Sequence, residues 1–221
     1  MKYYPMFLRV AGRSCLVIGG GNVAAQKVDG LLAAGARVTV ISPELCGPLE
    51  ALAAAGKMTH LARAYAPGDV RGFFLVFAAT DDQEVQSQVV REAHELGVLL
   101  NVVDRPTLCD FIAPAVIERG DLTIAVSTSG TSPALARQVR RQLAARFGPE
   151  YALALQLLRR LRERLVAPPQ TAADRQRIFT ALVESPLLDY LREHRIADID
   201  RLLAQTVGNG VSVAELGVEL T

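Results

Sequence analysis

The chain has 221 residues, half of them hydrophobic, which suffices for one substantial core or for a core and a small second domain. Its formal net charge of +1 gives no sign of binding to nucleic acid or membranes through bulk charge. The three cysteines have neither disulfide-framework nor metal-site spacing, and no apolar run approaches the roughly 18 residues that span a bilayer. We therefore expect a cytoplasmic protein without a signal peptide, with no nucleic-acid partner and no membrane partner.

The first 110 residues alternate short apolar runs with helical patterns. Nearly continuous apolar strands are typical of a sheet covered on both faces, and this alternation is typical of right-handed βαβ units. We therefore expect an α/β fold with a Rossmann-type, mostly parallel sheet and helices on both faces. The expected strands are 15–19, 37–42, 58–62, 74–80 and 98–103, and the expected helices are 23–34, about 48–55 and 83–96.

The pattern changes after residue 110. Two extended runs joined by Arg-Gly-Asp lead into a loop rich in Ser, Thr and Gly, and then into a helix over 133–147, for which Ser132 is the expected N-cap. A second helix over 150–166 is expected to end at Pro168-Pro169, because proline cannot continue a helix.

These changes predict three parts. The Rossmann domain is expected over 1–110, a mixed α+β region over 111–148, and a helical C-terminal domain, broken at Pro186, over 149–221.

A glycine-rich turn follows the first expected strand. Gly19-x-Gly21-x-x-Ala24 fits the dinucleotide fingerprint, in which the first glycine permits a tight turn and the second lets the backbone approach the pyrophosphate. The N-terminus of the next helix then supplies N–H groups and a favourable dipole for the phosphates. The alternative is a glycine turn that serves only tight strand–helix packing.

The second expected strand ends in Ser-Pro-Glu, where this fold places an acid that binds the adenosine ribose. Glu44 or the backbone of Pro43 can take that role. No arginine follows immediately, so a 2′-phosphate has no obvious partner, and NAD is favoured over NADP.

The fourth strand ends in Ala-Ala-Thr-Asp-Asp, where small residues leave room for the nicotinamide half of the cofactor. Thr80 or Asp81 can hydrogen-bond it. The alternative is that this segment only starts the next helix, with Asp82 as its cap.

Asp104 lies just beyond the fifth expected strand, again at the carboxyl edge where such sheets bind ligands. A carboxylate there can act as a general base or hold a cationic group. It can equally be a turn residue before Arg105-Pro106.

Five segments together resemble the precorrin-2 dehydrogenase family, the N-terminal module of siroheme synthase that also occurs as a free-standing enzyme. They are "VIGGGNVAAQK", "AGARVTVISPEL", "AATDD", "NVVDRP" and "FIAPAVIERGDLTIAVSTSGTSPALAR", in that order, and the resemblance is close over residues 3–147. It implies NAD-dependent oxidation of precorrin-2 to sirohydrochlorin. In some members it also implies insertion of Fe²⁺ into the product to give sirohaem.

The resemblance also implies roles for particular residues. Asp104 matches the aspartate regarded as the key residue for both reactions, and the half after residue 110 is implied to form a homodimer. The position of Thr128 is a phosphorylated serine in some relatives. The positions assigned to NAD are Asn22, Val23, Pro43 and Glu44. The loop implied to line the tetrapyrrole site is Ser127, Thr128, Ser129, Gly130, Thr131 and Ser132.

The chemistry of the residues agrees with a tetrapyrrole that carries many carboxylates. Loop 127–132 offers hydroxyl and N–H groups, and Arg137, Arg140 and Arg141 follow it. Across 134–166, eight arginines stand against two glutamates, and arginine pairs well with carboxylates. The alternative for part of this basic belt is a solvated helix face.

None of the three histidines, His60, His94 and His194, has a neighbouring ligand at helical spacing, so we expect no resident metal site. Iron would be a substrate that passes to the macrocycle. The competing function is a non-catalytic NAD-sensing regulatory domain, such as those that gate potassium transport. That function explains residues 15–103 but leaves loop 127–132 and the basic belt without a purpose.

Overall fold

The computed structural model describes residues 2–165 and 171–219, so the helix end expected at Pro168-Pro169 lies outside the described residues. The chain divides into two compact units, Met1–Ala113 and Pro114–Thr221, and each unit is described by itself. The further boundary expected near residue 148 stays a prediction.

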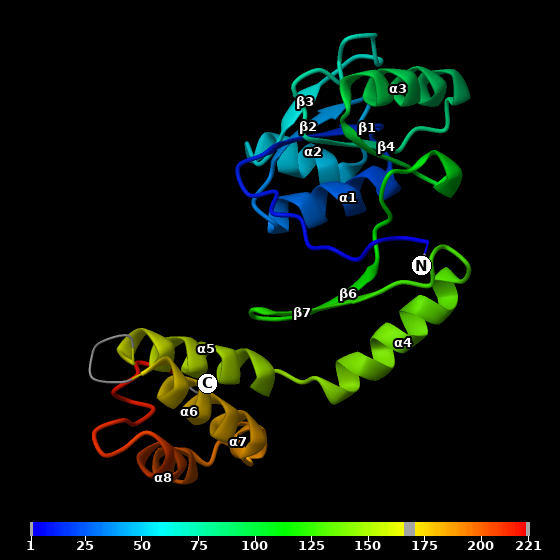
Figure 1. The fold of residues 1–221 in the computed structure, drawn as a ribbon. Coiled ribbons are helices and arrows are strands. Elements are labelled where there is room, and N and C mark those ends of the chain that lie inside the picture. Colours follow the sequence, from blue (N-terminus) through cyan, green and yellow to red (C-terminus); the bar gives the residue numbers. More distant parts are fainter. Residues whose placement is uncertain (1, 166–170, 220–221) are drawn as a thin grey trace. The chain divides into compact units, whose positions relative to one another are not determined.

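A five-stranded parallel sheet forms the centre of the first unit, with the order β3-β2-β1-β4-β5. Figure 1 labels β1 to β4 of this sheet. The order reverses between β1 and β4, and ligands bind at such a switch point in open α/β sheets. The α/β prediction is confirmed, and the observed strands lie within the expected runs or begin one residue before them. They are β1 (Ser14–Ile18), β2 (Arg37–Ile41), β3 (Thr59–Leu61), β4 (Leu75–Ala78) and β5 (Leu99–Val102).

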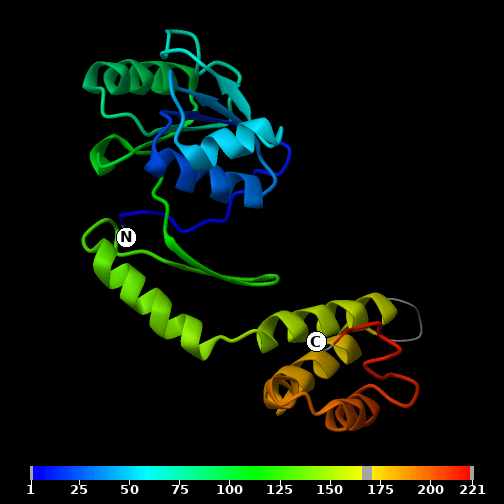
Figure 2. The same cartoon turned by 180° about the vertical axis from the view of Figure 1, so that it is seen from behind.

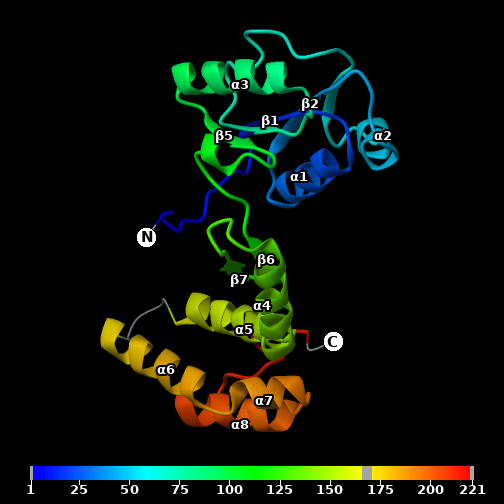
Figure 3. The same ribbon diagram turned by 90° about the vertical axis from the view of Figure 1, so that its right-hand side faces the viewer.

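Helices cover both faces of this sheet (Figure 3). In β1, Cys15 and Val17 pack with α1 and α2, whereas Leu16 and Ile18 pack with α3. This two-sided burial is the reason that the strand is apolar at every position. Burial also raises the pKa of the Cys15 thiol, as expected of a core cysteine. The helices are α1 (Asn22–Ala33), α2 (Gly47–Ala54) and α3 (Gln83–Leu96).

The second unit begins with an antiparallel hairpin of β6 (Ala115–Arg119) and β7 (Leu122–Val126), followed by α4 (Pro133–Arg146). Four helices then share one apolar core, seen in yellow to red in Figure 2. Pro186 precedes α7, as expected of a helix break. These helices are α5 (Glu150–Arg164), α6 (Ala172–Glu184), α7 (Leu187–Arg192) and α8 (Ile196–Thr206).

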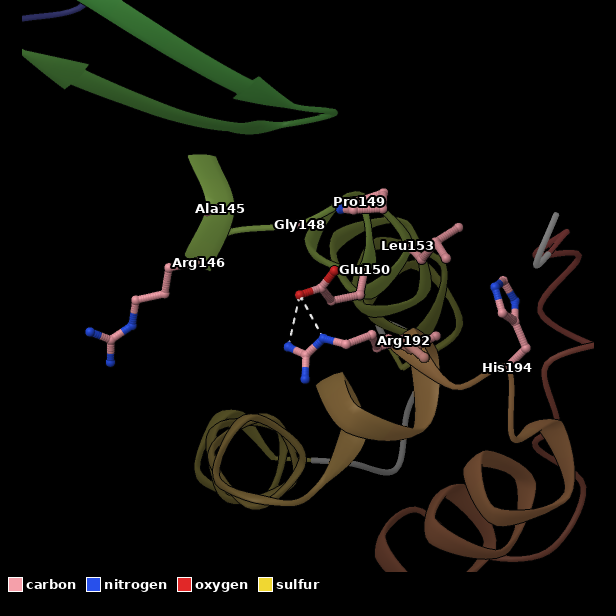
Figure 4. Close-up of a pocket in the computed structure, with 9 residues that line it drawn as sticks. Ala145, Arg146, Gly148, Pro149, Glu150, Leu153, Arg192 and His194 are labelled. Atoms are coloured by element: carbon pink, nitrogen blue, oxygen red, sulfur yellow. Dashed lines mark hydrogen bonds and ion pairs between the residues drawn. The ribbon is translucent and has the colours of Figure 1, made fainter. Parts of the chain in front are cut away.

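An ion pair between the buried Glu150 and the half-exposed Arg192 joins α5 to α7 beside a pocket of about 420 Å³ (Figure 4). Glu150 is 3% exposed and accepts hydrogen bonds from Nη2 and Nε of Arg192 at 2.9 and 3.3 Å. Burial by itself raises the pKa of the Glu150 carboxyl, but the bonds from Arg192 outweigh it and hold the pKa below its ordinary value. Glu150 also begins α5, where a negative charge is favourable.

Glu150→Gln is expected to lower the free energy of unfolding at pH 7 by about 1–2 kcal/mol, because charged hydrogen bonds are lost. A carboxyl whose folded pKa is lowered stabilises the fold above its unfolded pKa of about 4.3. That stabilisation is lost as the pH falls through the lower folded value. The difference between the two proteins should therefore shrink on acidification, as measured by urea unfolding from pH 7 to pH 3.

The matched control is Asp189→Asn, which removes the exposed partner of the same Arg192, 2.7 Å from its Nη1. An exposed pair contributes little, so we expect a change below about 0.5 kcal/mol. Equal losses from the two variants would contradict the role assigned to Glu150.

Candidate active site

One row of residues across the sheet aligns the ends of four strands. Ile18 pairs with Ile41 and with Ala78, and Ala78 pairs with Val102. The segments that follow this row therefore leave the sheet at the same level. They carry every candidate cofactor residue and Asp104, so the structure brings these candidates together at one edge of the first unit.

The glycine loop after β1 is packed against its neighbours. Gly19 has φ +115°, and a Cβ there would overlap the carbonyl oxygen of Ala79. A Cβ on Gly20 would overlap the carbonyl oxygen of Glu44 and lie 2.7 Å from Ser42 Oγ. Gly20 was not among the residues expected to matter, because the fingerprint leaves its position variable. The run of three glycines was the signal for it.

Gly21 differs from its neighbours because a Cβ built there meets nothing within 4 Å. It is the N-cap residue of α1 and contributes no side chain. The first N–H groups of a helix have no partner inside it, and here they belong to Asn22, Val23 and Ala24. Val23 is 43% exposed, whereas Ala24 is fully buried against the core. The surface above Gly21 thus offers free N–H groups and open space, which suits a pyrophosphate.

The segment after β2 borders a pocket of about 460 Å³ that includes Pro43, Glu44, Glu50 and His60 in its lining. His60 Nε2 lies 2.9 Å from the carbonyl oxygen of Ser42 and so fixes the start of this segment. Pro43 and Glu44 are exposed. Two carboxylates therefore line the space that follows β2.

The segment after β4 lies at the carboxyl edge of the sheet and also leads into α3. The Asp82 carboxylate accepts from the N–H groups of Glu84 and Val85, at 2.9 and 3.1 Å, so Asp82 is the cap proposed as the alternative. Thr80 accepts twice: its Oγ1 from the N–H of Asp82, and its carbonyl oxygen from a side-chain amide of α3. Asp81 is exposed and lies between these two structural residues.

Asp104 lies in a turn that follows β5. The N–H of Arg105 donates to the carbonyl oxygen of Val102 at 3.3 Å, which closes the turn around Val103 and Asp104. Asp104 has φ +61°, a conformation that costs energy for most residues but that Asp and Asn tolerate better. Its side chain is exposed at the edge. Asp104 is therefore a turn residue and also a carboxylate available to a ligand.

The loop expected to bind substrate lies in the second unit, between β7 and α4. Thr128 Oγ1 accepts from the N–H of Ser132 at 3.1 Å and donates to its carbonyl oxygen at 3.0 Å. Ser127 Oγ accepts from the N–H of Ser129, and the N–H of Thr131 donates to the carbonyl of Thr128. The loop is thus held in a defined shape, with Ser129 and Gly130 at positive φ.

Ser132 caps α4, as expected, since its Oγ accepts from the N–H of Leu135 at 3.2 Å. Arg137, Arg140 and Arg141 follow on α4 and, among the described residues, make no hydrogen bond or ion pair. The part of the basic belt on α5 is different: Arg159 pairs with Asp121, and three further α5 arginines contact neighbouring groups. The free guanidinium groups of the belt therefore lie on α4.

The described residues contain no group of three or more His, Cys, Asp or Glu side chains that could hold a metal ion. Over the same residues, no helix is long and apolar enough to cross a membrane.

Comparisons with known proteins cover both units. A family described as "Putative NAD(P)-binding" matches residues 6–115, and one described as "Sirohaem biosynthesis protein central" matches residues 119–146. The siroheme synthase of Thioalkalivibrio sulfidiphilus is 37% identical over 220 residues, covering 100% of this chain and 45% of that protein. The siroheme synthase of Methylococcus capsulatus is 39% identical over 209 residues, covering 93% and 43%. The chain thus spans less than half the length of these relatives.

Among solved structures, SirC, a precorrin-2 dehydrogenase, matches with a TM-score of 0.78 and 25% identity, covering 92% of this chain and 98% of that one. The first unit is thus an NAD(P)-binding domain, and loop 127–132 with the start of α4 lies within the sirohaem biosynthesis match. The chain belongs to the family of sirohaem biosynthesis proteins that includes siroheme synthase and the precorrin-2 dehydrogenase SirC.

Proposed function

We propose that this chain is an NAD-dependent dehydrogenase that oxidises precorrin-2 to sirohydrochlorin. The observation that carries the proposal is the likeness to a precorrin-2 dehydrogenase over nearly the whole of both chains. The second unit matters here, because the sirohaem biosynthesis match lies in it. The alternative function, a non-catalytic NAD sensor, does not explain that match.

The residues at the sheet edge fit NAD. Backbone atoms of neighbouring segments fill the space beside Gly19 and Gly20, whereas the surface above Gly21 is open for a pyrophosphate. Glu44 and Glu50 line the adjoining pocket, where a carboxylate can accept from ribose hydroxyls and would repel a 2′-phosphate. This charge favours NAD over NADP. Asn22 and Val23 at the start of α1, Pro43, Thr80 and Asp81 complete the proposed cofactor site.

The reaction removes one hydride and one proton from the macrocycle. NAD⁺, when bound, supplies the acceptor for the hydride at its nicotinamide ring. Asp104 is proposed as the base that takes the proton, since its carboxylate is exposed at the same edge as the glycine loop. The main contribution of the other residues is alignment of substrate and cofactor.

The substrate is proposed to be held through its acetate and propionate carboxylates. In the second unit, Arg137 follows a loop whose backbone is fixed by Thr128, and the N-terminus of α4 adds a favourable dipole. Arginine can form paired hydrogen bonds with a carboxylate. Loop 127–132 with Arg137 is therefore the proposed tetrapyrrole contact.

A homodimer in the cytosol is proposed as the working form. The β6–β7 hairpin has two strands, and Ile117 is the only buried residue in them. An isolated two-stranded hairpin has marginal stability. Pairing with a second copy would cover it. Cys15, Cys46 and Cys109 are free thiols, which suits a reducing compartment.

Fe²⁺ is proposed as a further substrate, inserted into sirohydrochlorin to give sirohaem. Fe²⁺ replaces two protons of the macrocycle, and Asp104 can accept them one at a time, passing the first to water before it takes the second. No resident metal ion is needed for this step, because the macrocycle nitrogens provide the ligands.

The test is anaerobic incubation of the full chain with precorrin-2 and either NAD⁺ or NADP⁺. We expect NADH to form in step with the change in macrocycle absorption, and NADP⁺ to be a poorer acceptor. Absence of NADH in a protein that binds NAD would overturn the dehydrogenase and favour the sensor. In a second arm, Fe²⁺ or Co²⁺ is added to sirohydrochlorin, and an unchanged absorption spectrum would overturn the chelatase.

A further inference from the structure

The strand β5 lies at the edge of the sheet, yet its outer side is not left open. On that side the N–H and carbonyl groups of Leu100 and Val102 face away from β4, and unpaired groups of this kind are a liability. Asp110 pairs with Leu100: its Oδ2 accepts from the Leu100 N–H, and its own N–H donates to the Leu100 carbonyl, both at 2.9 Å. Cys109 in turn contacts the polar backbone groups of Val102. Its Sγ lies 3.2 Å from both the nitrogen and the carbonyl oxygen of Val102.

Cys109 also reaches the other end of the Asp104 turn. Its Sγ lies 3.3 Å from the carbonyl oxygen of Arg105, the residue after Asp104. A 3₁₀ turn, η1 (Pro106–Leu108), returns the chain to β5, and the Leu108 N–H donates to the same Arg105 carbonyl at 3.0 Å. One thiol therefore contacts the residues that open and close the turn.

This contact acts on a turn that needs support. Asp104 has φ +61°, so its backbone is in a region that few residues other than glycine occupy without cost. A single turn hydrogen bond of 3.3 Å joins Arg105 to Val102. Without further bonds, the turn can relax and displace the carboxylate.

We propose that Cys109 is a positioning residue for Asp104, in that its thiol fixes the turn through Val102 and Arg105. The inference rests on the proposed function, because it assumes that the Asp104 carboxylate takes part in turnover. It also explains why the cysteine is half-buried beside an edge strand and packs with the α3 side of the core.

The protonation state of the thiol agrees with this role. Burial is the main cause that raises the pKa of Cys109, and the nearby Asp110 carboxylate raises it further. The hydrogen bond from the Val102 N–H lowers this pKa, but the net shift is upward. The thiol therefore keeps its proton at neutral pH and can donate to the carbonyl of Val102 or Arg105 while accepting from the Val102 N–H. Serine keeps both abilities, whereas alanine has neither.

The test compares Cys109→Ala, Cys109→Ser and a control, Ser87→Ala. Ser87 lies exposed on α3 and donates to the carbonyl of Gln83 at 2.7 Å, so the control removes one side-chain bond to backbone without touching β5. We expect Cys109→Ala to lower kcat roughly tenfold with an unchanged KM for NAD, because misplacement of a reacting group reduces turnover. Cys109→Ser should recover part of the loss, and Ser87→Ala should match the wild type.

A double-mutant cycle separates positioning from general destabilisation. If Cys109 acts through Asp104, then Cys109→Ala has no further effect on the residual rate of Asp104→Asn. An equal loss in both backgrounds, or a fully active Cys109→Ala protein, would overturn the proposal. NAD binding by each variant serves as the check that the first unit is folded.

Amide hydrogen exchange provides a readout that needs no turnover. The Val102 N–H is bonded to the thiol, so we expect its exchange to rise at least about tenfold in Cys109→Ala and not in Ser87→Ala. Unchanged exchange would show that the Cys109 thiol does not hold the Val102 N–H and would overturn the proposal. A wild-type protein that makes no NADH would instead refute the proposed dehydrogenase, so the two failures are distinguishable.

Discussion

Asp104→Asn is expected to lower the turnover of precorrin-2 about 10²- to 10⁴-fold, the usual contribution of a general base, while NAD affinity changes less than about twofold. Asparagine has the shape of aspartate and tolerates positive φ, so the turn at φ +61° can be kept. It cannot accept a proton. Initial rates of anaerobic NADH formation and an NAD titration measure the two effects.

Two further variants isolate the chemistry. Asp104→Gly relieves the backbone cost at positive φ, so it should be folded as well as the wild type and yet lose the same turnover. Asp29→Asn removes an exposed carboxylate on α1 and should leave the rate unchanged. A fast Asp104→Asn enzyme would contradict the role as base. Loss of NAD binding in that variant would indicate that Asp104 binds the cofactor.

The sheet and its helices could be predicted because their causes are local. Residues such as Leu16 and Val17 point to opposite faces and are both fully buried, so the strand is apolar throughout and easily found. Two helix starts are also visible in the sequence, since Ser132 is the expected cap of α4 and Asp82 the alternative role considered at α3. Parallel strands also end at one edge, which is why the candidate cofactor residues could be expected there together.

Other features depend on contacts that no short pattern contains. The Glu150–Arg192 pair joins residues 42 positions apart. The positive φ of Asp104 gave no signal because the residue is not a glycine. Cys109 lies in no recognisable motif, and its role at the edge of β5 depends on how the chain returns after η1. Such contacts are set by tertiary packing.

Gly20 and Gly21 illustrate the same limit, because adjacent residues of one type have opposite surroundings. Gly20→Ala is expected to destabilise the fold by about 1–3 kcal/mol, since its Cβ would overlap the Glu44 carbonyl and crowd Ser42 Oγ, and the backbone of Glu44 would have to move. Urea unfolding followed by circular dichroism measures this change. An unaltered midpoint would mean that the loop can shift freely away from Glu44.

Gly21→Ala is expected to lower the free energy of unfolding by less than about 1 kcal/mol, because alanine is a poorer N-cap than glycine, and to weaken NAD binding at least about a hundredfold, or 2.7 kcal/mol. Its Cβ meets no protein atom within 4 Å and enters the space where the backbone must approach the pyrophosphate. Gly30→Ala on α1 is the control, since its Cβ also meets nothing within 4 Å and alanine favours helix. That variant should be slightly more stable and bind NAD normally. A Gly21→Ala protein with wild-type affinity would show that the pyrophosphate does not lie over Gly21, whereas the expected split would mean that Gly20 shapes the loop and Gly21 receives the cofactor.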